Sequence, residues 1–433
     1  MKQNWYKFLP LLSIIIFIAC ICASIKRDIQ NLHDGYSCDL RKRIVGARYQ
    51  AEGKSPYFFK WQEGQDVRLC DPFETGPSLK QNVTTLPPGY LWILQPLSKL
   101  NFPDIELIWF IVQYTGILLV FCLFFIHARS QLARTILPLL FSLFLFSKGW
   151  IFNIDIGQSY IIFPLLWSVG YFAGKEESKK LLFSGIILAL CCWLRPVCIL
   201  MALPFLLSAN RKSFLKGFIA TGLVCLLQMI LCGQYNNFKE FVEASYLWTD
   251  YYNNLTHTLP GDFRTGPWPT VIEGQSDFSI TALPEYTANF PIVTRALFNT
   301  RIPSSIFLLV LIVFIAVTLA FIKIKNKQPG IKTLWLAGFI IYYAGELFVS
   351  IPKPSYYFVE LLFPVCLIFY GFTGKQKFPL LFICLGLFLA CLFLKLLPMQ
   401  LLLAEYIIIA GVIATLVYLI NIKPEQTTIA VVQ

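Results

Sequence analysis

Long apolar segments are the feature of this sequence that most constrains its fold. Hydrophobic residues make up 57% of the 433 positions and charged residues only 14%, whereas a soluble domain has about 25% charged residues. An α-helix needs about 20 apolar residues to cross a bilayer, and the clearest segments near this length are residues 8–23, 105–126, 305–322, 378–394 and 401–420. The sequence therefore predicts an all-α polytopic membrane protein forming a single domain over residues 1–433.

Basic residues are concentrated in the short connectors between the apolar segments, around Lys7, Arg129, Lys179, Arg211, Lys325, Lys377 and Lys423. Short basic connectors belong on the cytoplasmic side, so the net charge of +12 is explained by topology. No nucleic-acid partner is expected. The chain then threads as about 12 transmembrane helices with both termini inside, an uncleaved first helix, and two external loops at residues 25–104 and 234–301.

Residues 181–208 are flanked by basic connectors at both ends, so a single crossing would place one connector on the wrong side. Two half-length helices joined by a turn at Arg195 and Pro196 avoid this conflict, because proline ends a helix. Short helices of this kind are tolerated where they line a cavity walled by protein.

The first external loop is expected to contain two interfacial helices. From Leu40 to Tyr49, apolar and basic residues fall on different helical faces, as in a helix that lies on the membrane surface. Asp39, directly before it, is either the N-cap of this helix or a residue with a chemical role. Pro87 and Pro88 are expected to begin the second helix.

Two of the cysteines, Cys38 and Cys70, lie in the polar first external loop rather than in an apolar segment. On the outer side of a membrane they are expected either to form a disulfide or to remain as two free thiols.

Several polar residues at the outer ends of the predicted spans complete a candidate site. Asp155 and Gln158 lie at one such end, Arg195 lies at the turn of the half-helices, and Lys353 and Tyr356 follow a later span. A charge within the membrane is costly, so each is a functional candidate, with snorkelling or loop solvation as the alternative for Arg195 and Lys353. One carboxylate and several cations suit a lipid with a phosphate in its head group, because the carboxylate can take a proton from a hydroxyl.

A series of motifs resembles glycosyltransferase family 87, the polyprenol-phosphate-mannose-dependent mannosyltransferases of the GT-C membrane fold. In chain order, the motifs are Asp39-Leu40-Arg41, Val45-Gly46-Ala47-Arg48, Gly53-Lys54-Ser55-Pro56-Tyr57, Leu86-Pro87-Pro88-Gly89-Tyr90, Gln95-Pro96-Leu97, Gly157-Gln158-Ser159, Leu194-Arg195-Pro196 and Tyr356-Tyr357-Phe358-Val359-Glu360-Leu361-Leu362-Phe363-Pro364. The resemblance extends over most of the chain.

The resemblance implies that a hexose, mannose in the known members, passes from a polyprenol-phosphate donor to an extracytoplasmic glycan or glycolipid acceptor with inversion. Asp39 would be the general base, and Gln158 and Asp155 would line the sugar pocket. The other substrate-binding residues would be Arg195, which holds the phosphate with Arg41 or Lys353, together with Arg48 and Tyr356. No cofactor or metal ion is expected.

The sequence departs from the family at Tyr356, because the family commonly has a histidine near this position. Tyrosine donates a hydrogen bond but carries no positive charge at neutral pH, so a hexose other than mannose remains open. In the second external loop, an aromatic-rich segment that contains Trp248, His257 and Trp268 is expected either to contact the acceptor or to form an interfacial belt.

Two other functions stay open at this level. One is a flippase or exporter of lipid-linked sugars, and the other is an oligosaccharide ligase or polymerase. The long first external loop and the lack of paired internal repeats favour the enzyme over a transporter. The expected location is the plasma membrane, with the active site on the extracytoplasmic side.

Overall fold

The computed structural model describes residues 5–32, 37–59, 61–62, 64–71, 84–128, 130–174, 181–252, 289–298, 302–326, 328–348, 355–371, 377–391 and 400–421. Within these ranges every regular element is a helix, and one isolated antiparallel bridge joins Ser147 to Cys391. The predicted all-α fold is confirmed.

Six helices are long and apolar enough to cross a membrane. They are α1 (Trp5–Leu32), α4 (Phe102–Ile126), α10 (Arg211–Leu231), α15 (Ser304–Lys325), α16 (Ile331–Phe348) and α19 (Gln400–Asn421). Shorter apolar helices include α5 (Gln131–Leu145), α7 (Ile162–Gly174), α8 (Leu181–Leu194), α17 (Leu362–Phe369) and α18 (Lys377–Ala390). The chain therefore has the character of a polytopic integral membrane protein, and the count of twelve spans stays a prediction.

The predicted break at Arg195 is present. Helix α8 ends at Leu194, and a helical segment of three short pieces follows: η3 (Pro196–Cys198), α9 (Ile199–Ala202) and η4 (Leu203–Leu207). Gly185 of α8 packs on the backbone of Phe214 in α10, and Cys192 lies near Cys225 further along both helices. The two helices are thus parallel and begin at the same level, so the residues after Arg195 return toward the side where α8 began.

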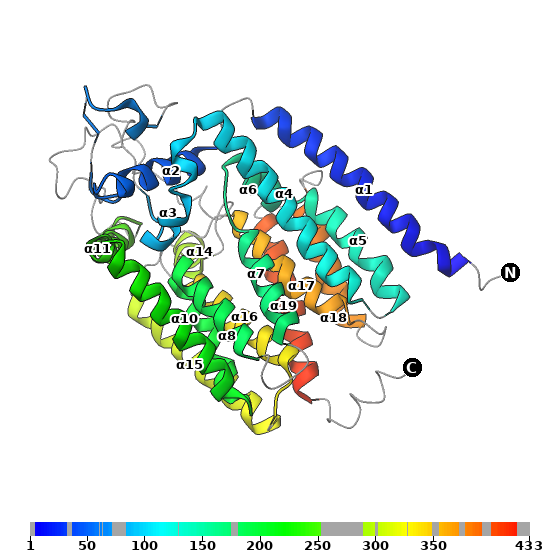
Figure 1. The fold of residues 1–433 in the computed structure, drawn as a ribbon. Helices are drawn as coiled ribbons and strands as arrows, with labels where there is room; N and C mark the ends of the chain where they lie inside the picture. The colour runs from blue at the N-terminus through cyan, green and yellow to red at the C-terminus, as the bar shows by residue number, and fades with distance from the viewer. Residues whose placement is uncertain are drawn as a thin grey trace.

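Five elements lie together at one end of the helix bundle (Figure 1). There lie α2 (Cys38–Ala51), η1 (Val67–Leu69), α3 (Pro88–Leu94), η2 (Leu97–Lys99) and α11 (Tyr235–Tyr252). Helix α1 begins and α19 ends on the opposite side (Figure 1). The remaining described helices are α6 (Lys148–Asp155), α14 (Phe290–Phe298) and η5 (Ser355–Leu361).

Helix α2 differs from the predicted surface helix in its environment. Most of its apolar residues and two of its four basic residues are buried in protein, while Lys42 and Arg48 are partly exposed. The buried set is Leu40, Arg41, Arg43, Ile44, Val45, Gly46, Ala47, Tyr49 and Gln50. The expectation of a helix lying on the membrane surface is therefore wrong, because α3, η1 and η2 pack around it. The predicted end of the helix is correct: Gly53, at φ +69°, follows its last turn. The predicted start of α3 at the prolines is also confirmed.

Large aromatic side chains fill the centre of the helix bundle. Trp150, Trp167 and Trp335 are almost fully buried. Trp167 of α7 packs edge-on against Phe339 and Tyr342 of α16. Such aromatic pairs add stability beyond that of their buried area, and here they hold α7 against α16.

Candidate functional site

Asp39 lies in the first turn of α2 rather than before it. Ser37 is the N-cap residue, and its backbone oxygen accepts a hydrogen bond from the Arg41 amide at 3.0 Å. The expectation that Asp39 is the N-cap is therefore wrong, because the helix begins two residues earlier, at Cys38. The Asp39 amide donates to the carbonyl of Ile156 at 3.1 Å, so the backbone of Asp39 lies next to the turn that contains Gln158.

The side chain of Gln158 holds the Asp39 carboxylate. Its Nε2 donates a hydrogen bond to Oδ2 of Asp39, while its Oε1 accepts one from the guanidinium of Arg43. Arg43 also donates to the Gly157 carbonyl at 3.1 Å. Because an amide has distinct donor and acceptor ends, these contacts fix the orientation of Gln158. Gln158 is almost fully buried and Asp39 is partly exposed, so the carboxylate is the accessible end of this chain.

The backbone of Gln158 is held as firmly as its side chain. Its carbonyl accepts hydrogen bonds from Trp109, at 2.9 Å, and from Gln113, both on α4. Asn153 donates in turn to Gln113 at 3.1 Å. These bonds hold the Gln158 carbonyl in place, while Oδ1 of Asn153 has no hydrogen-bond partner among the described residues.

Gly157 allows α2 to approach this turn closely. Its φ is +69°, and a Cβ added to it would lie 2.6 Å from the Cβ of Leu40, next to Asp39. A side chain in the left-handed region costs about 1–2 kcal/mol, and the clash adds about 1–3 kcal/mol because the neighbouring atom is not a flexible end. Glycine is thus the residue that this contact requires.

Gly157→Ala is therefore expected to lower the thermal unfolding midpoint of the detergent-solubilised protein and to reduce its activity. Gly53→Ala is the matched control, since Gly53 has the same φ of +69° but nothing within 4 Å of an added Cβ. The backbone strain is shared by both variants, so the difference between them reports the packing of α2 on the turn. Equal midpoints would show that this packing contributes nothing.

Asp155 belongs to a different network from Asp39. Its Oδ1 accepts a hydrogen bond from Asn31 of α1 at 3.0 Å. Burial raises the pKa of the Asp155 carboxyl above its ordinary value, and the nearby Asp28 acts in the same direction. The Asp155 side chain thus joins α1 to α6, whereas the side chain that bonds the Asp39 carboxylate is that of Gln158.

Arg195 lies at the turn between α8 and η3 and is paired with two carboxylates. Its NH2 is 2.9 Å from Oε1 of Glu346, and its NH1 contacts Oε1 of Glu360. Tyr342 donates to the other oxygen of Glu360 at 2.8 Å. The apolar stretch around Arg195 predicts a functional cation, but Glu346 and Glu360 are not among the predicted site residues. The sequence signal that could have identified them is a carboxylate within an apolar segment, which is costly and therefore a functional candidate.

Aromatic rings enclose the Arg195 guanidinium. Its central carbon is 4.5 Å from the ring centroid of Tyr357 and 5.0 Å from that of Tyr160. Tyr356 stacks on Tyr160 with centroids 5.2 Å apart. Tyr160 follows Gln158 by two residues, so one short turn carries both the partner of Asp39 and a wall of the Arg195 cluster. Lys353 lies outside the described residues.

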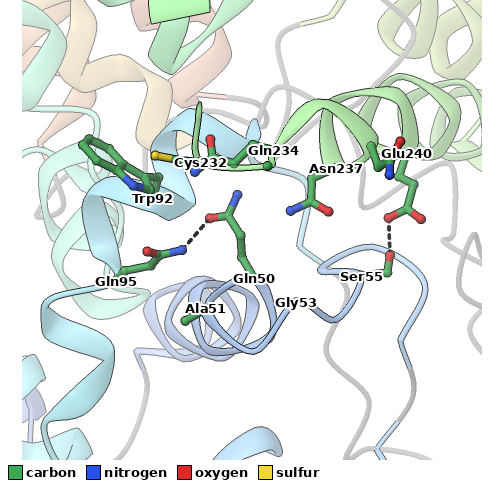
Figure 2. A pocket seen from close by; sticks show the side chains of 12 residues that line it. Gln50, Ala51, Gly53, Ser55, Trp92, Gln95, Cys232, Gln234, Asn237 and Glu240 are labelled. Carbon is green, nitrogen blue, oxygen red and sulfur yellow. Dashed lines mark hydrogen bonds between the residues drawn. The ribbon is translucent and has the colours of Figure 1, made fainter. Parts of the chain in front are cut away.

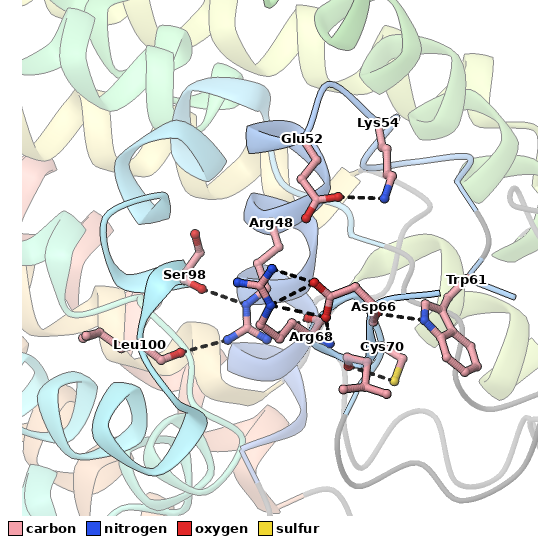
Figure 3. A network of polar contacts seen from close by, with 10 residues as sticks. Arg48, Glu52, Lys54, Trp61, Asp66, Arg68, Cys70, Ser98 and Leu100 are labelled. Atoms are coloured by element: carbon pink, nitrogen blue, oxygen red, sulfur yellow. Dashed lines mark hydrogen bonds and ion pairs between the residues drawn. The ribbon is translucent and has the colours of Figure 1, made fainter. Parts of the chain in front are cut away.

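Arg41 and Arg48 point away from Asp39. With 3.6 residues per turn, a residue nine positions along a helix lies on its opposite face. Arg48 donates to the carbonyls of Ser98, Arg68 and Leu100 at 2.8, 2.8 and 3.0 Å (Figure 3). Arg41 pairs with the buried Asp71 at 2.7 Å. We therefore take both arginines as structural residues rather than substrate-binding ones.

The two cysteines of the first external loop are free thiols. Cys70 is buried and its Sγ donates to the Val67 carbonyl at 3.1 Å. Burial raises the pKa of the Cys38 thiol, with the Asp39 carboxylate acting in the same direction. Within the described ranges, no three His, Cys, Asp or Glu side chains come together as ligands for a metal ion.

Comparison with known protein families identifies the class of this protein. The model of glycosyltransferase family 87 matches residues 85–341, which is more than half of the chain. The chain belongs to glycosyltransferase family 87. This confirms the resemblance seen in the sequence. The matched part of the glycosyltransferase includes Gln158 and Arg195, whereas Asp39, Glu346 and Glu360 lie outside it. Neither a curated protein nor a solved structure matches the chain.

Proposed function

We propose that this glycosyltransferase moves a hexose, with mannose as the first candidate, from a polyprenol-phosphate sugar to an extracytoplasmic glycan or glycolipid acceptor. The observation that carries the proposal is the carboxylate of Asp39, partly exposed and held in one orientation by Gln158. A general base must be fixed and accessible to the proton it takes. Asp39 meets both requirements at the polar end of an apolar helix bundle.

In the proposed reaction, a hydroxyl of the acceptor donates its proton to Asp39 as its oxygen attacks the anomeric carbon. The bond between that carbon and the phosphate oxygen breaks, and the polyprenol phosphate leaves with the electron pair. Attack from the face opposite the leaving group inverts the anomeric configuration. Gln158 supports the reaction by keeping the Asp39 carboxylate turned toward the acceptor.

The polyprenol phosphate needs positive charge, and Arg195 remains our candidate for orienting it. The pairing with Glu346 and Glu360 means that Arg195 brings no net positive charge to the site. We therefore assign the additional charge to Lys353, two residues before η5 in the chain, and the role of hydrogen-bond donor to Tyr356. The prenyl tail would remain among the apolar helices.

The side of the membrane follows from the basic connectors. Helix α15 ends in Lys323 and Lys325, and α10 begins with Arg211 and Lys212. These ends belong in the cytoplasm by the positive-inside rule, so α2 and Asp39 would face the extracytoplasmic side of the plasma membrane. A flippase would use a similar groove, but membership of a glycosyltransferase family favours bond chemistry.

The test is incubation of the purified protein with polyprenol-phosphate mannose, glucose or galactose, each labelled in the sugar, and a membrane extract as the source of acceptors. We expect one of the three donors to label a glycan or glycolipid. A nucleotide sugar added in place of the lipid donor is the control. Transfer from the nucleotide sugar, with none from any lipid donor, would contradict the proposal.

A further inference from the structure

A polar pocket of about 500 Å³ lies between the two external loops. One wall is formed by the C-terminal end of α2 and by α3, and the other by the residues that lead from α10 into α11. Figure 2 shows Gln50 on the first side, with Gln234 and Asn237 on the second. The volume falls in the range of known small-molecule sites. It has room for a ligand rather than for water alone.

The chemistry of the lining points to a neutral ligand rich in hydroxyl groups. Five side-chain amides line the pocket, from Gln50, Gln95, Gln234, Asn236 and Asn237. An amide both donates and accepts hydrogen bonds, as a hydroxyl does. The lining also contains the indole of Trp92, whose face suits the apolar side of a sugar ring.

The charge of the lining excludes the lipid phosphate. Among the described residues, the lining includes no lysine or arginine, and its one ionisable carboxylate is Glu240, which accepts a hydrogen bond from Ser55 at 2.5 Å. A phosphate would therefore meet negative charge without a cation to bind it. The pocket is thus distinct in chemistry from the region around Arg195.

The amide side chains of the lining differ in their hydrogen bonds. Oε1 of Gln234 is buried and has no hydrogen-bond partner among the described residues. By contrast, Gln50 and Gln95 are bonded to each other at 3.3 Å (Figure 2). The amides that are open to a ligand are those of Asn236, which is exposed, and Asn237, which is partly exposed.

The pocket lies well away from the proposed base. Gln50 and Asp39 are 11 residues apart on α2, which is three turns and about 16 Å along the helix. Eleven residues make almost a whole number of turns, so both side chains are on the same helical face. A single hexose in the pocket would not reach Asp39, and only an acceptor of several sugars is long enough to occupy both places.

We propose that this pocket binds a sugar unit of the acceptor remote from the hydroxyl that reacts, so that the acceptor is an oligosaccharide or glycan chain. This inference rests on the proposed function, because it assumes that Asp39 marks the point of transfer. Binding a remote unit lets the enzyme recognise the length of its acceptor through interactions that play no part in the chemistry.

Binding is tested by saturation-transfer NMR of the full-length protein in detergent with mannotriose, maltotriose and chitotriose. We expect at least one to bind, and Asn237→Ala to weaken that binding by about five- to tenfold, the value of one hydrogen bond. Lys239→Ala, an exposed neighbour on α11 outside the lining, is the control and should bind as the wild type does. Absence of binding to the wild type, or equal binding by the Asn237 variant, would overturn the inference.

Two further measurements separate this inference from the proposed function. Asp39→Asn should bind the trisaccharide normally, because it is three helical turns away. In the transfer assay, Asn237→Ala should raise the KM for the acceptor and leave the KM for the donor unchanged. An acceptor KM equal to that of the wild type would overturn the acceptor role of the pocket. Wild-type protein that binds the trisaccharide but transfers no hexose would instead contradict the proposed function.

Discussion

Asp39→Asn is expected to lower the rate of hexose transfer by about 10²–10⁴-fold, the usual contribution of a general base. Asparagine has nearly the shape of aspartate and can still accept a hydrogen bond from Gln158 through its amide oxygen. It cannot take a proton from the acceptor hydroxyl. The loss should therefore appear in kcat, with little change in the KM of either substrate and no change in the thermal unfolding midpoint.

Asp66→Asn is the matched control for this experiment. Asp66 also lies in the segment between α1 and α4, and its carboxylate caps η1 and pairs with the exposed Arg68. The Arg68 guanidinium and amide hold the pKa of Asp66 at about 2, so it is ionised at neutral pH as a general base would be. It should tolerate the change without loss of transfer. Wild-type rates from the Asp39 variant would remove that residue from the mechanism.

Arg195→Met is expected to lower the free energy of unfolding by about 3–5 kcal/mol, the usual cost of breaking a buried ion pair on one side. The side chains of Glu346 and Glu360 are 8% and 0% exposed, so without Arg195 two carboxylates would stay buried with no counter-charge. Methionine fills a similar volume, and the loss would therefore come from charge rather than from a cavity. Thermal unfolding of the purified protein in detergent measures it.

Two further variants identify the cause of that loss. Combining Arg195→Met with Glu346→Gln and Glu360→Gln should recover most of the stability, because removing all charges of a buried cluster is often neutral. Arg68→Met breaks an exposed ion pair and should leave the midpoint unchanged. If Arg195→Met alone were as stable as the wild type, the ion pairs would not stabilise the fold.

Backbone features of this protein were predictable from the sequence wherever a local rule applied. The break at Arg195 followed from basic connectors on both sides of one apolar stretch and from Pro196. The end of α2 near Gly53 and the start of α3 at Pro88 followed from the preferences of glycine and proline. Each of these features depends on residues that are neighbours in the chain.

The contacts of the site were harder to predict because they join distant segments. Gln158 is 119 positions from Asp39, and Glu360 is 165 positions from Arg195. A helical wheel separates the apolar and basic faces of α2 but cannot tell that protein covers both faces. For the same reason, the contacts of Arg41 with Asp71 and of Arg48 with backbone carbonyls could not be predicted from the sequence.

The enclosure of α2 has a consequence for how acceptors would be selected. Many enzymes carry a reactive group on a mobile flap that folds over whatever has bound. Here the carboxylate of Asp39 belongs to a helix that packs against α3, η1 and η2. Its position is fixed before any molecule arrives, so an acceptor must bring its own hydroxyl to that fixed point, and one of the wrong length or bend would fall short of it.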